Sequence, residues 1–135
     1  MTKNTKEFTN NIKNSDVSAI SFLNNNDAIT YLEELIKNSN MTKASLLKAI
    51  NHDINNGYKY LDGTRSMNRE FLLKVIITLK LDINVANRLL KLFSHSELYV
   101  KRKRDYLIIT GIINGFDIEQ INNILNTHED CDLLI

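Results

Sequence analysis

Polar side chains able to recognise a nucleic acid gather in residues 42–69, TKASLLKAINHDINNGYKYLDGTRSMNR. Asn55, Asn56 and Lys59 lie close together there, directly after Ile54. Asparagine amides pair with adenine through two hydrogen bonds, and lysine reaches guanine or phosphate. We therefore predict that these four side chains contact DNA bases. The alternative is that they are simply solvated on the outside of a small helix.

A second set of residues has the chemistry to hold phosphates. Backbone phosphates are typically bound at helix starts and in the turns beside them, by cations, hydroxyls and N–H groups. Several residues occupy such positions around 42–69, and the run KRKR at 101–104 is the densest charge cluster of the chain. The predicted phosphate contacts are Thr42, Lys43, Tyr58, Arg65, Arg69, Lys101, Arg102, Lys103 and Arg104.

The 101–104 run has competing interpretations. Cations at a helix N-terminus oppose the helix dipole, so a purely structural purpose is less natural there, and a phosphate partner would offset the repulsion. The run could equally be a solvated linker between Tyr99 and Tyr106, or it could form ion pairs with the acidic end of the chain. Both alternatives stay open at this point.

Catalysis and metal binding have little support in the sequence. His52, His95 and His128 are far apart, and Cys131 has no CxxC partner. The motifs GxGxxG, GxxxxGK[ST], HExxH and GxSxG do not occur. We expect no enzyme activity, no metal site and no cofactor.

The composition is typical of one globular unit. A chain of 135 residues with 43% hydrophobic and 24% charged residues suffices for a single core. It has no apolar run of about 18 residues, and its beginning lacks the apolar region of a secretory signal, so no membrane partner is expected. A single cysteine fits a reducing cytoplasm, which is the expected location.

The net charge of +1 hides an uneven distribution. Residues 1–40 carry four Lys and five acids, residues 41–104 carry thirteen Lys or Arg and five acids, and residues 105–135 carry six acids and no Lys or Arg. The balances are therefore −1, +8 and −6. A domain-sized basic block is typical of a polyanion binder, although Lys-rich exposed helix faces would also produce it.

The spacing of apolar residues predicts an all-α protein. Proline is absent and glycine is rare, which removes the usual punctuation of β-proteins. Apolar residues recur at helical intervals within 28–36, 46–50, 71–79, 83–93, 106–113 and 118–125. The plausible N-caps before these stripes are Asn26 or Asp27, Thr42, Asn68, Asp82 and Asp117, the last with Gln120 in a capping-box pattern.

Within 42–69 the pattern is two short helices joined by a tight turn, the unit that many proteins place in the DNA major groove. The turn falls near Asn51 and His52, Asp53 caps a helix over 53–61, and Gly63 can adopt the left-handed conformation that ends it. Gly57 inside that helix either permits close approach of another helix, with Leu47 as the candidate neighbour, or lets the helix bend. Of Tyr58 and Tyr60, the core position is expected for Tyr60.

These residues resemble a known family. Residues 27–93 resemble the lambda-repressor-like, Xre-type helix-turn-helix domains of bacteria and their phages. The segments GY at 57–58, DGTR at 62–65 and NR at 68–69 look like a pattern in small proteins of this class from low-GC Gram-positive bacteria. LYVKRKRDYLII at 98–109 and NGFDIEQIN at 114–122 are similar to the C-terminal extension of that group. Three departures from the family pattern are His52 at the turn, Leu47 where small residues are usual, and Met67 where proline is common.

The resemblance implies a lambda-repressor-like helix-turn-helix bundle with a C-terminal two-helix extension. The expected organisation is a partly flexible N-terminal arm over 1–26, the helix-turn-helix domain over 27–93, a helical pair over 94–128 packed on the same core, and an acidic tail over 129–135. The resemblance also implies sequence-specific binding to double-stranded DNA and transcriptional regulation, commonly as a homodimer. Helices 106–113 and 118–125 would form the dimer surface, unless Ile108, Ile109, Ile112 and Ile113 belong to the core.

Other functions remain open at this stage. Some members of this fold have become protein-binding adaptors or phage-type inhibitors, because a fold does not determine a function. A protein partner is therefore the competing expectation, and RNA binding through the same basic surface is a third one.

Overall fold

The computed structural model describes residues 25–50, 53–128 and 130. In this part of the chain it contains seven helices and no strand, which confirms the all-α prediction. The N-terminal arm up to residue 24, the turn residues 51 and 52, and most of the acidic tail lie outside the described residues. The helices are α2 (Asn25–Asn38), α3 (Lys43–Ala49), α4 (Ile54–Leu61), α5 (Arg69–Thr78), α6 (Ile83–Leu92), α7 (Lys103–Ile113) and α8 (Ile118–Thr127).

Five helices begin at residues whose side chains cap the first turn, as the sequence predicts. Thr42 accepts a hydrogen bond from the Ser45 N–H, and the two residues form a reciprocal capping box. Asp53, Asn68 and Asp82 cap α4, α5 and α6 by accepting from the N–H three residues later. Asp117 and Gln120 make the second capping box, at the start of α8. Each cap satisfies an N–H group that has no partner inside its helix.

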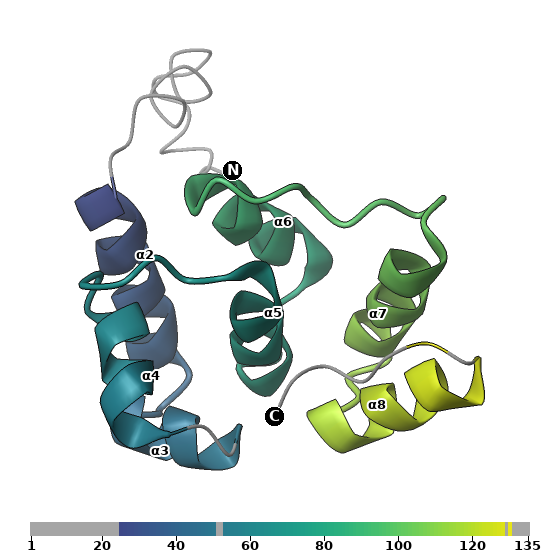
Figure 1. Cartoon of the computed structure of the whole chain (residues 1–135), viewed down its shortest axis with the longest axis horizontal. Helices are drawn as coiled ribbons and strands as arrows, with labels where there is room; N and C mark the ends of the chain where they lie inside the picture. Colours follow the sequence, from purple (N-terminus) through teal and green to yellow (C-terminus); the bar gives the residue numbers. More distant parts are fainter. Residues whose placement is uncertain (1–24, 51–52, 129, 131–135) are drawn as a thin grey trace.

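Helix α5 forms the centre of the molecule. Figure 1 shows it between α3 and α4 on one side and α7 and α8 on the other, with α6 behind and above it. All seven residues from Phe71 to Ile77 are buried, whereas the other helices bury one face. A helix that is buried all round needs neighbours on every side.

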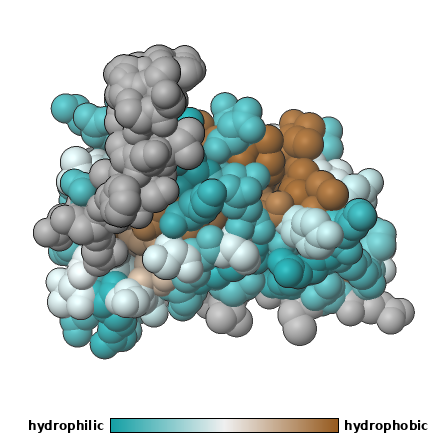
Figure 2. Space-filling view, turned by 90° about the horizontal axis from the view of Figure 1, so that it is seen from above, coloured by the Kyte–Doolittle hydropathy of each residue, from teal (hydrophilic) through white to brown (hydrophobic). Residues whose placement is uncertain are grey.

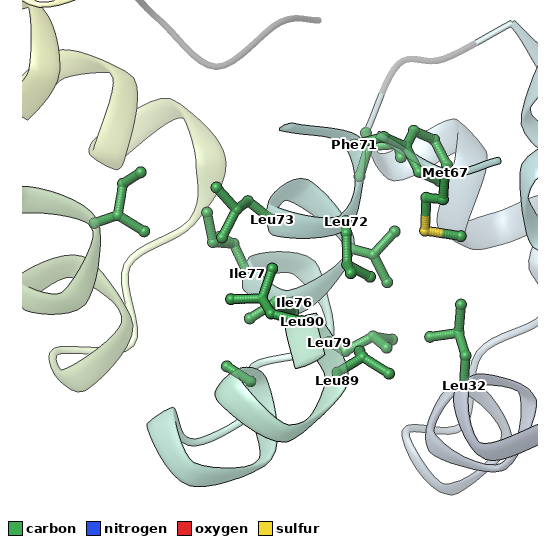
Figure 3. Close-up of a cluster of buried hydrophobic side chains, with 14 of the residues drawn as sticks. Leu32, Met67, Phe71, Leu72, Leu73, Ile76, Ile77, Leu79, Leu89 and Leu90 are labelled. Atoms are coloured by element: carbon green, nitrogen blue, oxygen red, sulfur yellow. The ribbon is translucent and has the colours of Figure 1, made fainter. Parts of the chain in front are cut away.

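One apolar cluster joins the helices. Figure 3 shows Leu72 and Ile76 of α5, and Leu79 directly after it, close to Leu89 of α6, with Leu32 of α2 beside them. The same cluster includes Leu107 to Ile109 of α7 and Ile121 and Leu125 of α8. The helical pair after residue 94 is therefore packed on the core that the earlier helices share.

Three helices end where a residue other than glycine has a positive φ. Asn40, Lys80 and Ser94 follow α2, α5 and α6 with φ angles of 59°, 58° and 66°. Non-glycine residues adopt this conformation at some energetic cost, and glycine is more usual there. Gly63 and Gly115 follow α4 and α7 with φ angles of 84° and 71°, and the left-handed conformation of Gly63 is the one that the sequence predicts.

Candidate nucleic-acid interface

Helices α3 and α4 pack against each other at one end of the molecule (Figure 1). Only residues 50–53 separate them, and the side chain of Asp53 starts α4 by accepting from the Asn56 N–H at 3.2 Å. Gly57 faces the fully buried Leu47, and a Cβ atom at residue 57 would lie 2.4 Å from Leu47 Cδ2. The expectation of close helix approach at Gly57 is therefore confirmed, with Leu47 as the neighbour.

The four residues of α4 that the sequence predicts as base contacts are all exposed. Ile54 is 48% exposed, and Asn55, Asn56 and Lys59 are exposed as well. Gly57 and Leu61 are buried on the inner side, so the helix has a clear outward face. The four side chains are therefore accessible to solvent, whereas their contact with bases stays a prediction.

The two tyrosines of α4 are both half-buried against the core. The ring of Tyr60 lies 4.8 Å from that of Phe71, in a tilted arrangement that aromatic pairs favour. The core position predicted for Tyr60 is confirmed, and Tyr58 also packs on the core. Only part of the Tyr58 side chain is therefore accessible to a phosphate.

Three exposed cations lie on α4 or on the segments next to it in the chain. Lys59 and Arg65 are exposed, and so is Lys48 at the end of α3, which is not among the predicted contacts. The side chains of these three residues have no hydrogen bond or ion pair with any residue that the structure describes. Their charges are therefore available to a polyanion beside α4.

Two predicted phosphate contacts at the start of α3 have partners within the chain. The Thr42 hydroxyl caps its own helix, and Lys43 Nζ donates to Glu33 at 2.7 Å and to Asp62 at 2.8 Å. Partial burial opposes protonation of Lys43, but the hydrogen bonds to Asp62 and Glu33 raise its pKa above the usual 10.5. The charge of Lys43 is thus balanced locally, which weakens its case as a phosphate ligand.

Arg69 belongs to a charged network that ties α5 to α7 and to the segment before it. Its guanidinium binds both carboxylate oxygens of Asp105, at 3.3 and 3.1 Å, and also donates to the carbonyls of Ser96 and Glu97. Asp105, with a side chain only 1% exposed, accepts in addition from the Tyr99 N–H at 3.0 Å and from Arg102 at 3.0 Å. A two-pronged contact of this kind is the strongest form of an Arg–carboxylate pair.

The environment of Asp105 favours its charged form. Burial alone would raise the pKa of this carboxyl, but the hydrogen bonds from Arg69, from the Tyr99 N–H and from Arg102 together lower it. The network therefore holds a buried negative charge that two cations neutralise. The sequence did not indicate this pairing, because 36 residues separate Arg69 from Asp105.

The 101–104 run does not act as one cluster. Arg102 pairs with Asp105, Lys103 donates to the His128 carbonyl at 2.5 Å, and Arg104 bridges Glu70 at 2.9 Å and Asp130 at 3.1 Å. The expectation that a structural role is less natural for these cations is wrong for Arg102 and Arg104. Their ion pairs with carboxylates compensate for the unfavourable interaction between a cation and the N-terminus of a helix. The alternative of ion pairs with the acidic tail is confirmed for Arg104.

The predicted phosphate contacts lie at two opposite ends of the molecule. Figure 1 places α4 at one end of the molecule and the start of α7, with residues 101–104, at the opposite end. Arg65 lies beside α4 and Lys101 lies before α7, and both are exposed. Tyr58 and Arg65 therefore lie on or beside α4, whereas Lys101 lies at the other end of the molecule.

Exposed apolar side chains concentrate near α7. Tyr99, Val100, Tyr106 and Ile113 are more than half exposed. Of the isoleucines that the sequence analysis assigned either to the core or to a dimer surface, Ile108 and Ile109 are buried, Ile112 is half-buried and Ile113 is exposed. Figure 2, which views the molecule from above Figure 1, shows apolar residues gathered in one part of a largely hydrophilic face.

The described residues contain no group of three or more His, Cys, Asp or Glu side chains that could hold a metal ion. Within the same ranges, 25–50, 53–128 and 130, no helix has both the length and the apolar character needed to cross a membrane.

Comparison of the chain with protein-family models, with curated proteins and with solved structures finds no match. The class that the fold defines is an all-helical protein in which two short helices, α3 and α4, pack at one end of a shared core.

Proposed function

We propose that this protein is a sequence-specific DNA-binding transcriptional regulator, with α3 and α4 as a helix-turn-helix of the lambda-repressor-like type. The observation that carries the proposal is the exposure of Ile54, Asn55, Asn56 and Lys59 on α4, while Gly57 of the same helix packs on Leu47. A helix fits the major groove, which is about 12 Å wide. Asn55 and Asn56 have the donor and acceptor pair that adenine requires.

The charges around α4 support the same proposal. Lys48, Lys59 and Arg65 are exposed on or next to α4 without a described partner, so they are free to neutralise phosphates. In this proposal Arg65 and Tyr58 contact the backbone, and Lys43, Arg69, Arg102 and Arg104 stabilise the fold instead. The proposal therefore uses a smaller phosphate-binding set than the sequence suggested.

The test separates base contacts from backbone contacts. The protein should bind a duplex selected from random DNA more tightly than scrambled DNA. Asn55→Ala or Asn56→Ala should reduce this difference in binding free energy by about 1–3 kcal/mol for the base pair concerned. Arg65→Ala should weaken all duplexes to a similar extent. Lys101→Ala is the matched control, because it removes an exposed cation at the other end of the molecule. Equal losses for Lys101→Ala and Arg65→Ala would contradict the proposed orientation.

A second candidate function is that of a protein-binding module, such as an adaptor or an inhibitor. The observation that favours it is the group Tyr99, Val100, Tyr106 and Ile113, because exposed apolar side chains near one another are typical of protein contacts. The same group would serve a homodimer of the regulator. Sedimentation over a range of concentrations separates the two, since a homodimer forms with the purified chain alone.

A further inference from the structure

Lys43 joins three helices through one ammonium group. It is the first residue of α3, and its Nζ donates to Glu33 of α2 at 2.7 Å and to Asp62 at 2.8 Å. Asp62 is the C-cap of α4, the helix that bears the proposed base contacts. The end of α4 is thereby fastened to both α2 and α3.

The other contacts of α4 with the rest of the protein are apolar. Gly57 meets Leu47 of α3, the ring of Tyr60 lies 4.8 Å from that of Phe71, and Leu61 is fully buried. Apolar burial is non-directional, whereas a hydrogen bond weakens steeply away from its preferred angle. The two hydrogen bonds of Lys43 therefore restrict the orientation of α4 in a way that its apolar contacts do not.

The position of Lys43 does not favour a contact with DNA. Its side chain is only 25% exposed, and the two carboxylates already neutralise its charge. A phosphate that approached the ammonium would also be repelled by Glu33 and Asp62. Any effect of Lys43 on DNA binding is therefore expected to act through α4.

The same ion pairs contribute little to stability as such. The side chains of Glu33 and Asp62 are 44% and 49% exposed, so water competes for both carboxylates. Their loss should leave the fold intact while it removes a restraint on the direction of α4. A role in orientation can thus be separated from a role in stability.

We propose that Lys43 is a positioning residue for sequence recognition, a role that rests on the DNA-binding function proposed above. It holds α4 in the orientation that brings Asn55 and Asn56 to the base edges, and it contacts no DNA itself. Two-point pairing with adenine requires each amide at a particular distance and angle. Discrimination between sequences therefore depends on a lysine that lies outside the contact surface.

Binding of a selected duplex and of scrambled DNA over a range of salt concentrations tests this role. Lys43→Met should lower the ratio of the two affinities by about fivefold or more, the least discrimination that one two-point base contact supplies. The slope of log affinity against log salt should stay unchanged, because no phosphate contact is lost. Lys43→Arg should retain most of the ratio, because a cation remains between the carboxylates.

Lys48→Met is the matched control, because Lys48 is an exposed lysine of the same helix. It should weaken both duplexes alike and keep the ratio of their affinities. A reduced salt slope with an unaltered ratio in Lys43→Met would make Lys43 a phosphate ligand, which would overturn the inference.

The two acids allow a test in which electrostatic attraction predicts the opposite result. Glu33→Gln combined with Asp62→Asn removes two negative charges, so a purely electrostatic effect would tighten binding to every duplex. The positioning role predicts that the ratio of affinities falls as in Lys43→Met. Tighter binding with an unaltered ratio would overturn the inference.

The orientation of α4 can also be measured without DNA. In Lys43→Met, the residual dipolar couplings of the backbone amides should change for α4 relative to α5, whereas Lys48→Met should leave them unaltered. Unaltered couplings in Lys43→Met would overturn the inference alone. An unmodified chain that prefers no duplex would instead refute the proposed function together with the role that rests on it, so the two failures are distinguishable.

Discussion

Asp105→Asn removes the charge at the centre of the contact between α5 and α7 while keeping the side chain's size. The carboxylate is 1% exposed and receives two hydrogen bonds from Arg69, one from Arg102 and one from the Tyr99 N–H. The amide can still accept with its oxygen, but its NH₂ group would face a guanidinium. Arg69 would then keep its carbonyl contacts with Ser96 and Glu97 and lose its anion.

The size of the stability loss in Asp105→Asn depends on how deeply the ion pairs are buried. Breaking a fully buried ion pair by removing one partner costs about 3–5 kcal/mol. Here the side chains of Arg69 and Arg102 are 23% and 54% exposed, so water compensates part of the loss. We therefore expect Asp105→Asn to lower the free energy of unfolding by about 2–3 kcal/mol at neutral pH.

The effect should depend on pH in a defined direction. The pKa of Asp105 in the folded protein is below its ordinary value of 3.8. Its charge therefore stabilises the fold at pH values above 3.8, and this contribution is lost as the pH falls from there through the folded pKa. The difference between the unaltered chain and Asp105→Asn should be constant near neutral pH and should shrink only below 3.8.

Urea unfolding followed by circular dichroism at several pH values measures both effects. Asp62→Asn is the matched control, because Asp62 is 49% exposed and pairs with Lys43 at the surface. Exposed pairs contribute about 1 kcal/mol or less, so the control should be much less destabilised. Equal destabilisation of the two variants, or a difference at Asp105 that persists unchanged well below pH 3, would refute the reasoning.

Three further variants test other parts of the account. Gly57→Ala places a methyl group 2.4 Å from Leu47 Cδ2, so it should destabilise by about 1 kcal/mol despite the better helix propensity of alanine, and it should instead stabilise in a Leu47→Ala background. Stabilisation in both backgrounds by urea unfolding would contradict the packing argument. Asp117→Ala removes the capping box of α8 and should cost about 1 kcal/mol in the same assay; no loss would show that the cap is dispensable. Lys59→Ala should reduce the slope of log affinity against log salt for a duplex by about 0.9 if Lys59 neutralises one phosphate, and an unchanged slope would exclude that contact.

The sequence predicted those features that depend on neighbours in the chain. The caps at Thr42, Asp53 and Asp117 are hydrogen bonds across three residues, so the residue types at that spacing are enough to find them. The outward face of α4 follows in the same way from helical periodicity. Gly57 could be linked to Leu47 because both lie in adjacent short helices whose packing is closely constrained.

The contacts between distant segments could not be predicted in this way. Arg104 reaches Glu70 across 34 residues, and a single sequence does not indicate which of many acids is the partner of an arginine. The charge run at 101–104 therefore suggested a phosphate site, whereas the fold gives two of its arginines carboxylate partners. Lys74 was likewise counted with the basic block, because lysine is usually exposed. The apolar residues on all sides of it in FLLKVII, 71–77, were the local signal that this helix is buried all round.

Selection of duplexes from a random DNA library tests the central claim most directly. The account predicts that the purified chain enriches one sequence motif, that binding to this motif weakens steeply as salt rises, and that the double variant Asn55→Ala, Asn56→Ala binds DNA but enriches no motif. The opposite result is equally clear. A chain that enriches no sequence and shows no salt-sensitive binding to any duplex would contradict the claim that α4 reads DNA.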